Sequence, residues 1–80
     1  MLKVLIVDDE PLVRRGIVLG VDWSARGCVV VGEAANGEEG LAAVERYKPN
    51  LIITDVRMPR MDGIAMMNRL RAAGCRAHAI

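Results

Sequence analysis

The chain has 80 residues, of which 52% are hydrophobic and only 2% aromatic, and its formal net charge is +1 at pH 7. This length accommodates one small domain, near the lower limit for a self-sufficient core, and that core has to be built from aliphatic side chains. The balanced charge argues against a protein that binds nucleic acid or membranes through its overall field, so functional groups must be sought locally.

The cysteine pattern and the N-terminal segment both indicate a cytoplasmic protein. Cys28 and Cys75 lie far apart in the sequence and form no C-x-x-C pair, which favours two reduced thiols. The apolar run that begins near Met1 is soon ended by Asp8, so it is not a signal peptide. No apolar run approaches the length that spans a membrane, so we expect no membrane partner.

The first predicted strand is the continuous apolar run 4–7, which stops at three acids. A continuous run is typical of a strand that is buried on both faces in a parallel sheet. Pro11 follows at a position suited to the first turn of a helix. We expect this helix to have an apolar side at Leu12, Val13, Ile17 and Leu19 and an outer side at Arg14 and Arg15.

The second predicted strand covers residues 28–31, where β-branched residues dominate. The next helix is predicted to begin after Asn36 as the N-cap, with Glu39 three residues further on, which is a variant of the capping box. Residues 48–50 end this helix. Its apolar residues, at helical spacing, are Leu41, Val44 and Tyr47.

The third predicted strand, residues 51–54, is again continuous and again followed by an acid, Asp55. Residues 56–61 are predicted to form a loop, and Asp62 to cap the third helix. The expected apolar stripe of this helix consists of Ile64, Met67 and Leu70, with Met66 partly exposed. The helix is predicted to stop at residues 73–74, and residues 77–80 to open a fourth strand.

The alternating order of predicted strands and helices indicates an α/β domain with a parallel sheet and helices on its faces. In open parallel sheets, functional groups gather at the carboxyl ends of the strands. Asp8 and Asp9 follow the first strand and Asp55 follows the third, so these carboxylates converge if the two strands are neighbours. Each acid taken alone is equally compatible with a helix cap or a solvated loop.

Three converging carboxylates repel one another, and a bound cation removes the conflict. Mg²⁺ suits such a site because it takes hard oxygen ligands and retains positions for water or phosphate oxygens. One of the carboxylates is then able to act as a nucleophile and form an aspartyl phosphate. His78, the only histidine, lies far from the acids in the predicted order and is interpreted as incidental.

Three segments together resemble the receiver domain of two-component response regulators. They are VLIVDDEP at residues 4–11, Asp55 followed by VRMP at 56–59, and MDG at 61–63. In this order and spacing the motifs are highly specific, and the resemblance covers essentially the whole chain. Residues 21–23 and 31–34 also resemble the subgroup of regulators that carry an AraC-type helix-turn-helix output domain.

The resemblance implies a role for each acid. Asp55 would be the phosphoacceptor, Asp9 would bind Mg²⁺ directly, and Asp8 would assist, partly through water. The backbone carbonyl of Arg57 would supply a further ligand. The implied fold is flavodoxin-like, with the sheet order 2-1-3-4-5, here incomplete with strands one to four and three helices.

Family members also carry a Ser or Thr at the end of strand four and a Lys at the end of strand five, and Ile80 precedes both positions. We therefore expect residues 1–80 to be the N-terminal part of a single receiver domain. An incomplete sheet leaves apolar surface and a strand edge open, which predicts self-association into a dimer, by strand exchange for example.

Three functional hypotheses follow. In the first, a sensor histidine kinase phosphorylates Asp55, and the phosphorylated form controls a DNA-binding output domain in transcription regulation. In the second, the chain is a Mg²⁺-dependent phosphatase or phosphotransferase of the haloacid-dehalogenase type. Those enzymes place an acid two residues after the nucleophile, where this chain has Arg57. In the third, the fragment is not phosphorylated and self-associates.

Overall fold

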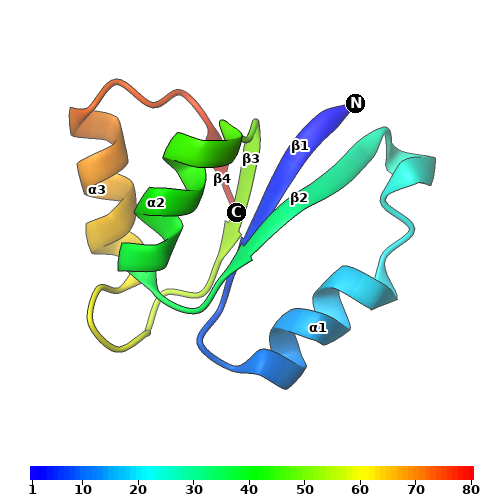
Figure 1. Ribbon diagram of the computed structural model, residues 1–80, viewed down its shortest axis with the longest axis horizontal. Coiled ribbons are helices and arrows are strands. Elements are labelled where there is room, and N and C mark those ends of the chain that lie inside the picture. Colours follow the sequence, from blue (N-terminus) through cyan, green and yellow to red (C-terminus); the bar gives the residue numbers. More distant parts are fainter.

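The computed structural model describes residues 1–80 and contains a four-stranded parallel sheet in the order β2-β1-β3-β4 (Figure 1). The strands are β1 (Leu2–Val7), β2 (Cys28–Ala34), β3 (Leu51–Thr54) and β4 (His78–Ala79). The order and the parallel pairing confirm the flavodoxin-like class and the expectation that the first and third strands are neighbours. No helix is both long enough and apolar enough to cross a membrane.

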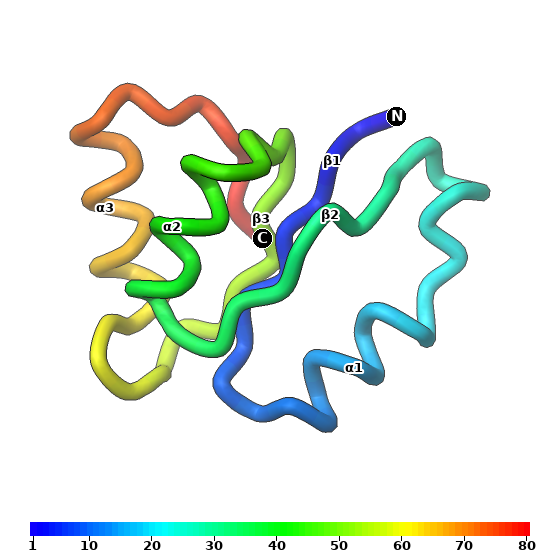
Figure 2. The backbone as a smooth tube through the Cα atoms, viewed as in Figure 1, coloured from blue at the N-terminus to red at the C-terminus, as the bar shows by residue number.

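Three α-helices pack on the two faces of this sheet. They are α1 (Pro11–Gly20), α2 (Gly37–Tyr47) and α3 (Gly63–Ala72), and a short 3-10 turn follows α1 at Ser24–Arg26. Figures 1 and 2 show α2 and α3 side by side on one face, with α1 on the other. The main core lies between the sheet and the α2–α3 pair, since most of its buried residues come from β1, β3, α2 and α3.

Strand β2 is longer than its sequence predicts. It continues past residue 31 to Ala34, and it pairs with β1 along the whole length of that strand. Gly32 and Glu33 interrupt the apolar run, and for this reason the strand predicted from the sequence ends at residue 31. An added Cβ at Gly32 would lie 2.8 Å from a ring carbon of Tyr47, so a larger residue there would require the ring to shift.

The inward side of α3 differs from the prediction. Leu70 is buried as predicted, but Met66, expected to be partly exposed, is fully buried, Met67 is only partly buried and Ile64 is 59% exposed. The helix begins at Gly63, which packs directly against the carbonyl of Asp55. That contact fixes the rotation of the helix and turns positions three and seven residues later, Met66 and Leu70, towards the core.

The inward side of α1 also differs from the prediction. None of its residues is fully buried, and Leu12 and Leu19 are 88% and 74% exposed. Ile17 and Val18 are half-buried, whereas Arg14, expected outside, turns towards the sheet. The partners of Arg14 are Asp8, directly after β1, and Glu33 on β2, so the helical pattern of α1 alone contains no sign of this orientation.

An acidic candidate site at the carboxyl edge of the sheet

The ends of β1 and β3 lie side by side because Val7 pairs with Thr54 in the parallel register. The residues that follow are therefore neighbours, and the Asp55 N–H donates to the Val7 carbonyl at 2.9 Å. Asp8 and Asp55 follow these paired residues directly, and Asp9 is one residue further along the chain. The sheet register, rather than any local motif, brings the two acidic segments together.

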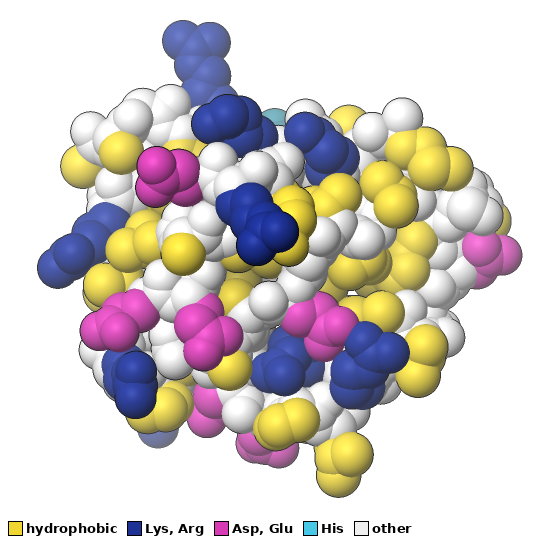
Figure 3. Space-filling model, in the orientation of Figure 1, with side chains coloured by type: hydrophobic (Ala, Val, Ile, Leu, Met, Phe, Trp, Pro, Cys, Tyr) yellow, Lys and Arg dark blue, Asp and Glu magenta, His cyan; other side chains and the backbone are white.

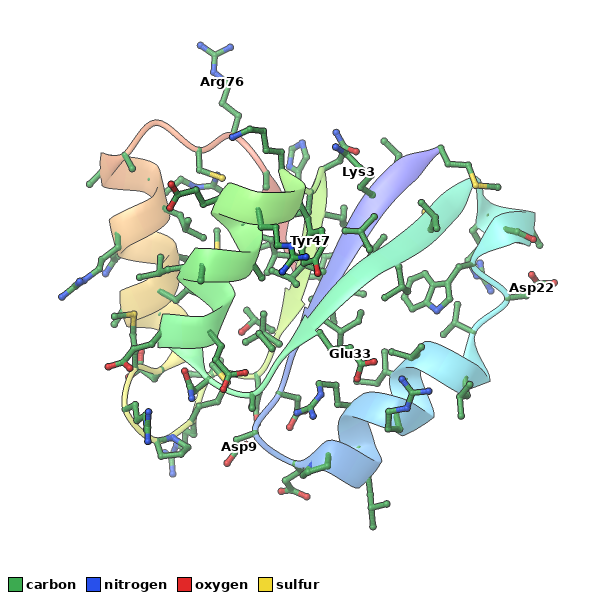
Figure 4. All side chains as sticks on the ribbon, in the orientation of Figure 1. Lys3, Asp9, Asp22, Glu33, Tyr47 and Arg76 are labelled. Carbon is green, nitrogen blue, oxygen red and sulfur yellow. The ribbon has the colours of Figure 1, made fainter.

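The three carboxylates form one cluster. Asp8, Asp9 and Asp55 each offer an oxygen, and these oxygens all lie within 4.8 Å of one another. Asp8 is buried, Asp9 is half-buried and Asp55 is exposed, so the cluster opens to solvent on the side of Asp55. Figure 4 shows Asp9 at the turn between β1 and α1, and Figure 3 shows acidic side chains gathering towards this edge of the molecule.

Each acid has a different set of hydrogen bonds. Asp8 is held at its N–H by the Ala34 carbonyl at 3.0 Å, and its Oδ1 accepts from the Glu10 N–H at 2.9 Å. Asp55 Oδ1 accepts from the Val56 N–H at 2.7 Å. The carboxylate of Asp9 accepts no hydrogen bond from the protein. Asp8 and Asp55 are thus oriented by backbone donors, and the Asp9 carboxylate keeps both oxygens free.

No cationic side chain forms an ion pair with these three carboxylates. The ion pairs of the molecule involve only Glu33 and Glu38 on the acidic side. Arg14 donates to the Asp8 backbone carbonyl and not to its carboxylate. Three carboxylates without an ion-pair partner form a set of hard oxygen donors, and such a set suits Mg²⁺ or another hard divalent cation. The donor chemistry therefore fits a metal ion with open positions for water or phosphate oxygens.

The loop after Asp55 is anchored at both of its ends. The Gly63 N–H donates to the Val56 carbonyl and the Gly37 N–H donates to the Met61 carbonyl, each at 2.8 Å. Arg57 lies between these anchors with an exposed side chain, and its carbonyl oxygen accepts no hydrogen bond from the protein. The loop therefore holds a free backbone oxygen two residues after Asp55.

Sequence reasoning missed several residues that shape this site. Thr54 donates its hydroxyl to the Asp55 carbonyl at 2.8 Å, Gly37 anchors the loop, and Arg14 reaches the Asp8 carbonyl with support from Glu33. The Asn-Gly pair before α2 was a visible signal for Gly37, although only as a helix start. For the Arg14 contacts no sequence signal exists, because Glu33 lies 19 positions away.

A parallel flavodoxin-like sheet with an acidic cluster at its carboxyl edge defines the class of this domain. The sequence model of the response regulator receiver domain family matches residues 4–80, and the chain belongs to that family. Response regulator receivers are signalling domains. The family assignment and the fold thus agree with the resemblance noted in the sequence.

Named relatives include transcriptional regulators. The chain is 35% identical over 72 residues to an uncharacterized transcriptional regulatory protein, YesN of Bacillus subtilis, covering 90% of this chain and 20% of YesN. It is 38% identical to the receiver domain of the response regulator AraT from Geobacillus stearothermophilus, with a TM-score of 0.90 over 98% of this chain and 60% of that one. A two-component transcriptional regulator AraC from Clostridium phytofermentans is 34% identical, with a TM-score of 0.89 over 99% of this chain and 61% of that one.

Proposed function

We propose that this chain is the N-terminal part of a receiver domain in which Asp55 accepts a phosphoryl group from a sensor histidine kinase. The observation that carries this proposal is the convergence of Asp8, Asp9 and Asp55, whose oxygens lie within 4.8 Å of one another. Asp55 is the exposed member of the three, so it is the one that a large protein donor is able to reach.

In this proposal Asp55 is the nucleophile, and the other acids of the cluster bind the metal ion. An oxygen of the Asp55 carboxylate attacks the phosphorus of a phosphohistidine, the P–N bond breaks, and the imidazole leaves with the electron pair and takes up a proton. Asp9 would hold Mg²⁺ directly, Asp8 partly through water, and the Asp55 carboxylate and the Arg57 carbonyl would complete the protein ligands. An ion held by these residues would supply positive charge to offset the charge on the transferring phosphoryl group.

The chemistry of the chain itself is limited to gaining and losing this phosphoryl group. The position two residues after Asp55 is Arg57, so the second acid typical of the dehalogenase-type phosphatases is missing. The parent protein would be a cytoplasmic regulator that binds DNA through a separate output domain and controls transcription. The AraC name of one structural relative supports an AraC-type output domain.

Intact-mass spectrometry after incubation with acetyl phosphate and Mg²⁺ tests the proposal. We expect one added phosphoryl group in the wild-type chain and in the control variant Asp22→Asn, which removes an exposed acid outside the cluster. The Asp55→Asn variant and the chelator-treated protein should add none. Addition to Asp55→Asn, or no addition to a wild-type chain with a folded circular dichroism spectrum, would contradict the proposal.

A second candidate is a self-associating fragment that is not phosphorylated. It is favoured by exposed apolar residues at two places, Leu12 and Leu19 on α1 and Ile80 beside the edge strand β4. Static light scattering at increasing micromolar concentrations separates the two candidates. A dimer that takes no phosphoryl group would support this second candidate, and a monomer throughout the concentration range would eliminate it.

A further inference from the structure

The inward-turned Arg14 contacts the acidic segment through its backbone. Its side chain is 16% exposed, its Nε donates to Glu33 Oε1 at 3.1 Å, and its guanidinium also donates to the carbonyl oxygen of Asp8. Figure 4 shows Glu33 on β2, pointing towards α1. Because a largely buried guanidinium is costly without a partner, Glu33 is what permits Arg14 to lie there.

The adjacent arginine offers an internal comparison. Arg15 pairs with the other carboxylate oxygen of Glu33, and its side chain is 52% exposed. It makes no hydrogen bond to the segment that holds Asp8 and Asp9. Two arginines of one helix therefore share one carboxylate, but only Arg14 reaches the acidic segment.

The carbonyl oxygen that Arg14 contacts belongs to the peptide group between Asp8 and Asp9, so the contact affects the orientation of both carboxylates. The carbonyl of Asp8 and the N–H of Asp9 belong to one planar peptide group. A charge-assisted hydrogen bond to that carbonyl limits the rotation of the plane, and the plane links ψ of Asp8 to φ of Asp9. Strand β2 thus holds Asp8 from two sides, through Ala34 at its N–H and through Glu33 and Arg14 at its carbonyl.

We propose that Arg14 is a positioning residue for the divalent cation, held by Glu33 and acting on Asp8 and Asp9 through the peptide group between them. This inference deepens the proposed function and rests on it for the identity of the ligand. A purely structural role, in which Arg14 only fastens α1 to β2, would make Arg14 and Arg15 equivalent in their effect on metal binding. Comparing variants of Arg14 and Arg15 therefore distinguishes the positioning role from a purely structural one.

The decisive measurement is the Mg²⁺ dissociation constant of the chain, obtained by isothermal titration calorimetry. Residues that support metal ligands typically change affinity about 10-fold to 100-fold, and we expect Arg14→Met to weaken Mg²⁺ binding about 10-fold. Arg15→Met, which also removes a partner of Glu33, should change it less than about 2-fold. Arg14→Lys should recover part of the loss, because an ammonium group retains one donor for the carbonyl.

A second readout needs no metal. The Glu10 N–H donates to Asp8 Oδ1, so its hydrogen-exchange rate reports whether Asp8 keeps its orientation in the metal-free chain. Arg14→Met should speed exchange at Glu10 relative to amides of α2, and Arg15→Met should not. Equal effects of the two variants on both readouts, or no effect of Arg14→Met on either, would overturn the inference.

The two readouts also separate this inference from the proposed function. A wild-type chain that binds no Mg²⁺ would contradict the proposed function, and the exchange rate at Glu10 would then decide the role of Arg14 alone. A wild-type chain that binds Mg²⁺ while Arg14→Met binds it equally well would leave the proposed function intact and refute the positioning role. If Arg14→Met loses its helical circular dichroism, Arg14→Lys is compared with Arg15→Lys instead. Weaker Mg²⁺ binding in Arg14→Lys alone would support the positioning role, and equal binding by the two variants would refute it.

Discussion

The two faces of the sheet are held together by different interactions. On the α2–α3 face, fully buried apolar side chains such as Leu5, Ile52 and Met66 form a continuous cluster. On the opposite face, α1 has no fully buried residue, and its defined contacts include ion pairs of its two arginines with a strand carboxylate. The first face is the main source of hydrophobic stabilisation, and the second places a charged contact beside the acidic cluster.

This difference has a consequence for the site. The segment with Asp8 and Asp9 connects β1 to α1, so the less buried helix is the one joined directly to the acids. Elements with few buried apolar contacts open at lower free energy than core elements. Local opening of α1 is therefore expected to disturb the carboxylate cluster before the α2–α3 core unfolds.

The largest contrast between the faces is expected from truncating one leucine on each. Leu5→Ala should lower the free energy of unfolding by about 2–5 kcal/mol, because it leaves a cavity in the core. Leu12→Ala should change it by less than about 0.5 kcal/mol, since this side chain is exposed. Urea unfolding followed by circular dichroism measures both. Similar losses in the two variants would show that Leu12 on α1 is packed as firmly as Leu5 in the core.

Glycine-to-alanine substitutions in α2 and α1 are expected to change the stability of the chain in opposite directions. A Cβ on Gly37 in α2 would lie 2.5 Å from the Met61 carbonyl oxygen, so Gly37→Ala should destabilise the chain by about 1–3 kcal/mol. A Cβ on Gly16 in α1 would have no atom within 4 Å, and Gly16→Ala should stabilise the chain by about 0.5–1 kcal/mol. Thermal unfolding checks both signs, and destabilisation by Gly16→Ala would reveal packing against α1 that the structure lacks.

The smallest expected contrast comes from the helix N-termini. The Asn36 side chain caps α2 by accepting from the Glu39 N–H at 2.9 Å, so Asn36→Ala should cost about 1 kcal/mol. Glu10 occupies the same position of α1 without a side-chain cap, and Glu10→Ala should cause no loss. Urea midpoints of the two variants test this. A loss for Glu10→Ala equal to that for Asn36→Ala would mean that α1 is capped in solution.

Several elements of the fold were predictable from local sequence. The predicted bounds of β3, residues 51–54, agree with those observed, and the caps of α2 and α3 by Asn36 and Asp62 were also confirmed. These features depend on residues close to one another in the chain, such as an apolar run that ends in an acid or an amide side chain three positions before the N–H that it caps. The presence of acids at two strand ends was visible for the same reason.

Other features depended on contacts between distant segments. The rotation of α3, which buries Met66 in place of Met67, follows from the packing of Gly63 against Asp55. The inward turn of Arg14 requires a carboxylate on another strand. The sequence alone determined the alternating elements, their caps and the positions of the acids, because periodicity and capping are local. Only the tertiary structure decided which side of each helix is buried and how the acids are held, because sheet register and ion pairing join residues that the chain keeps far apart.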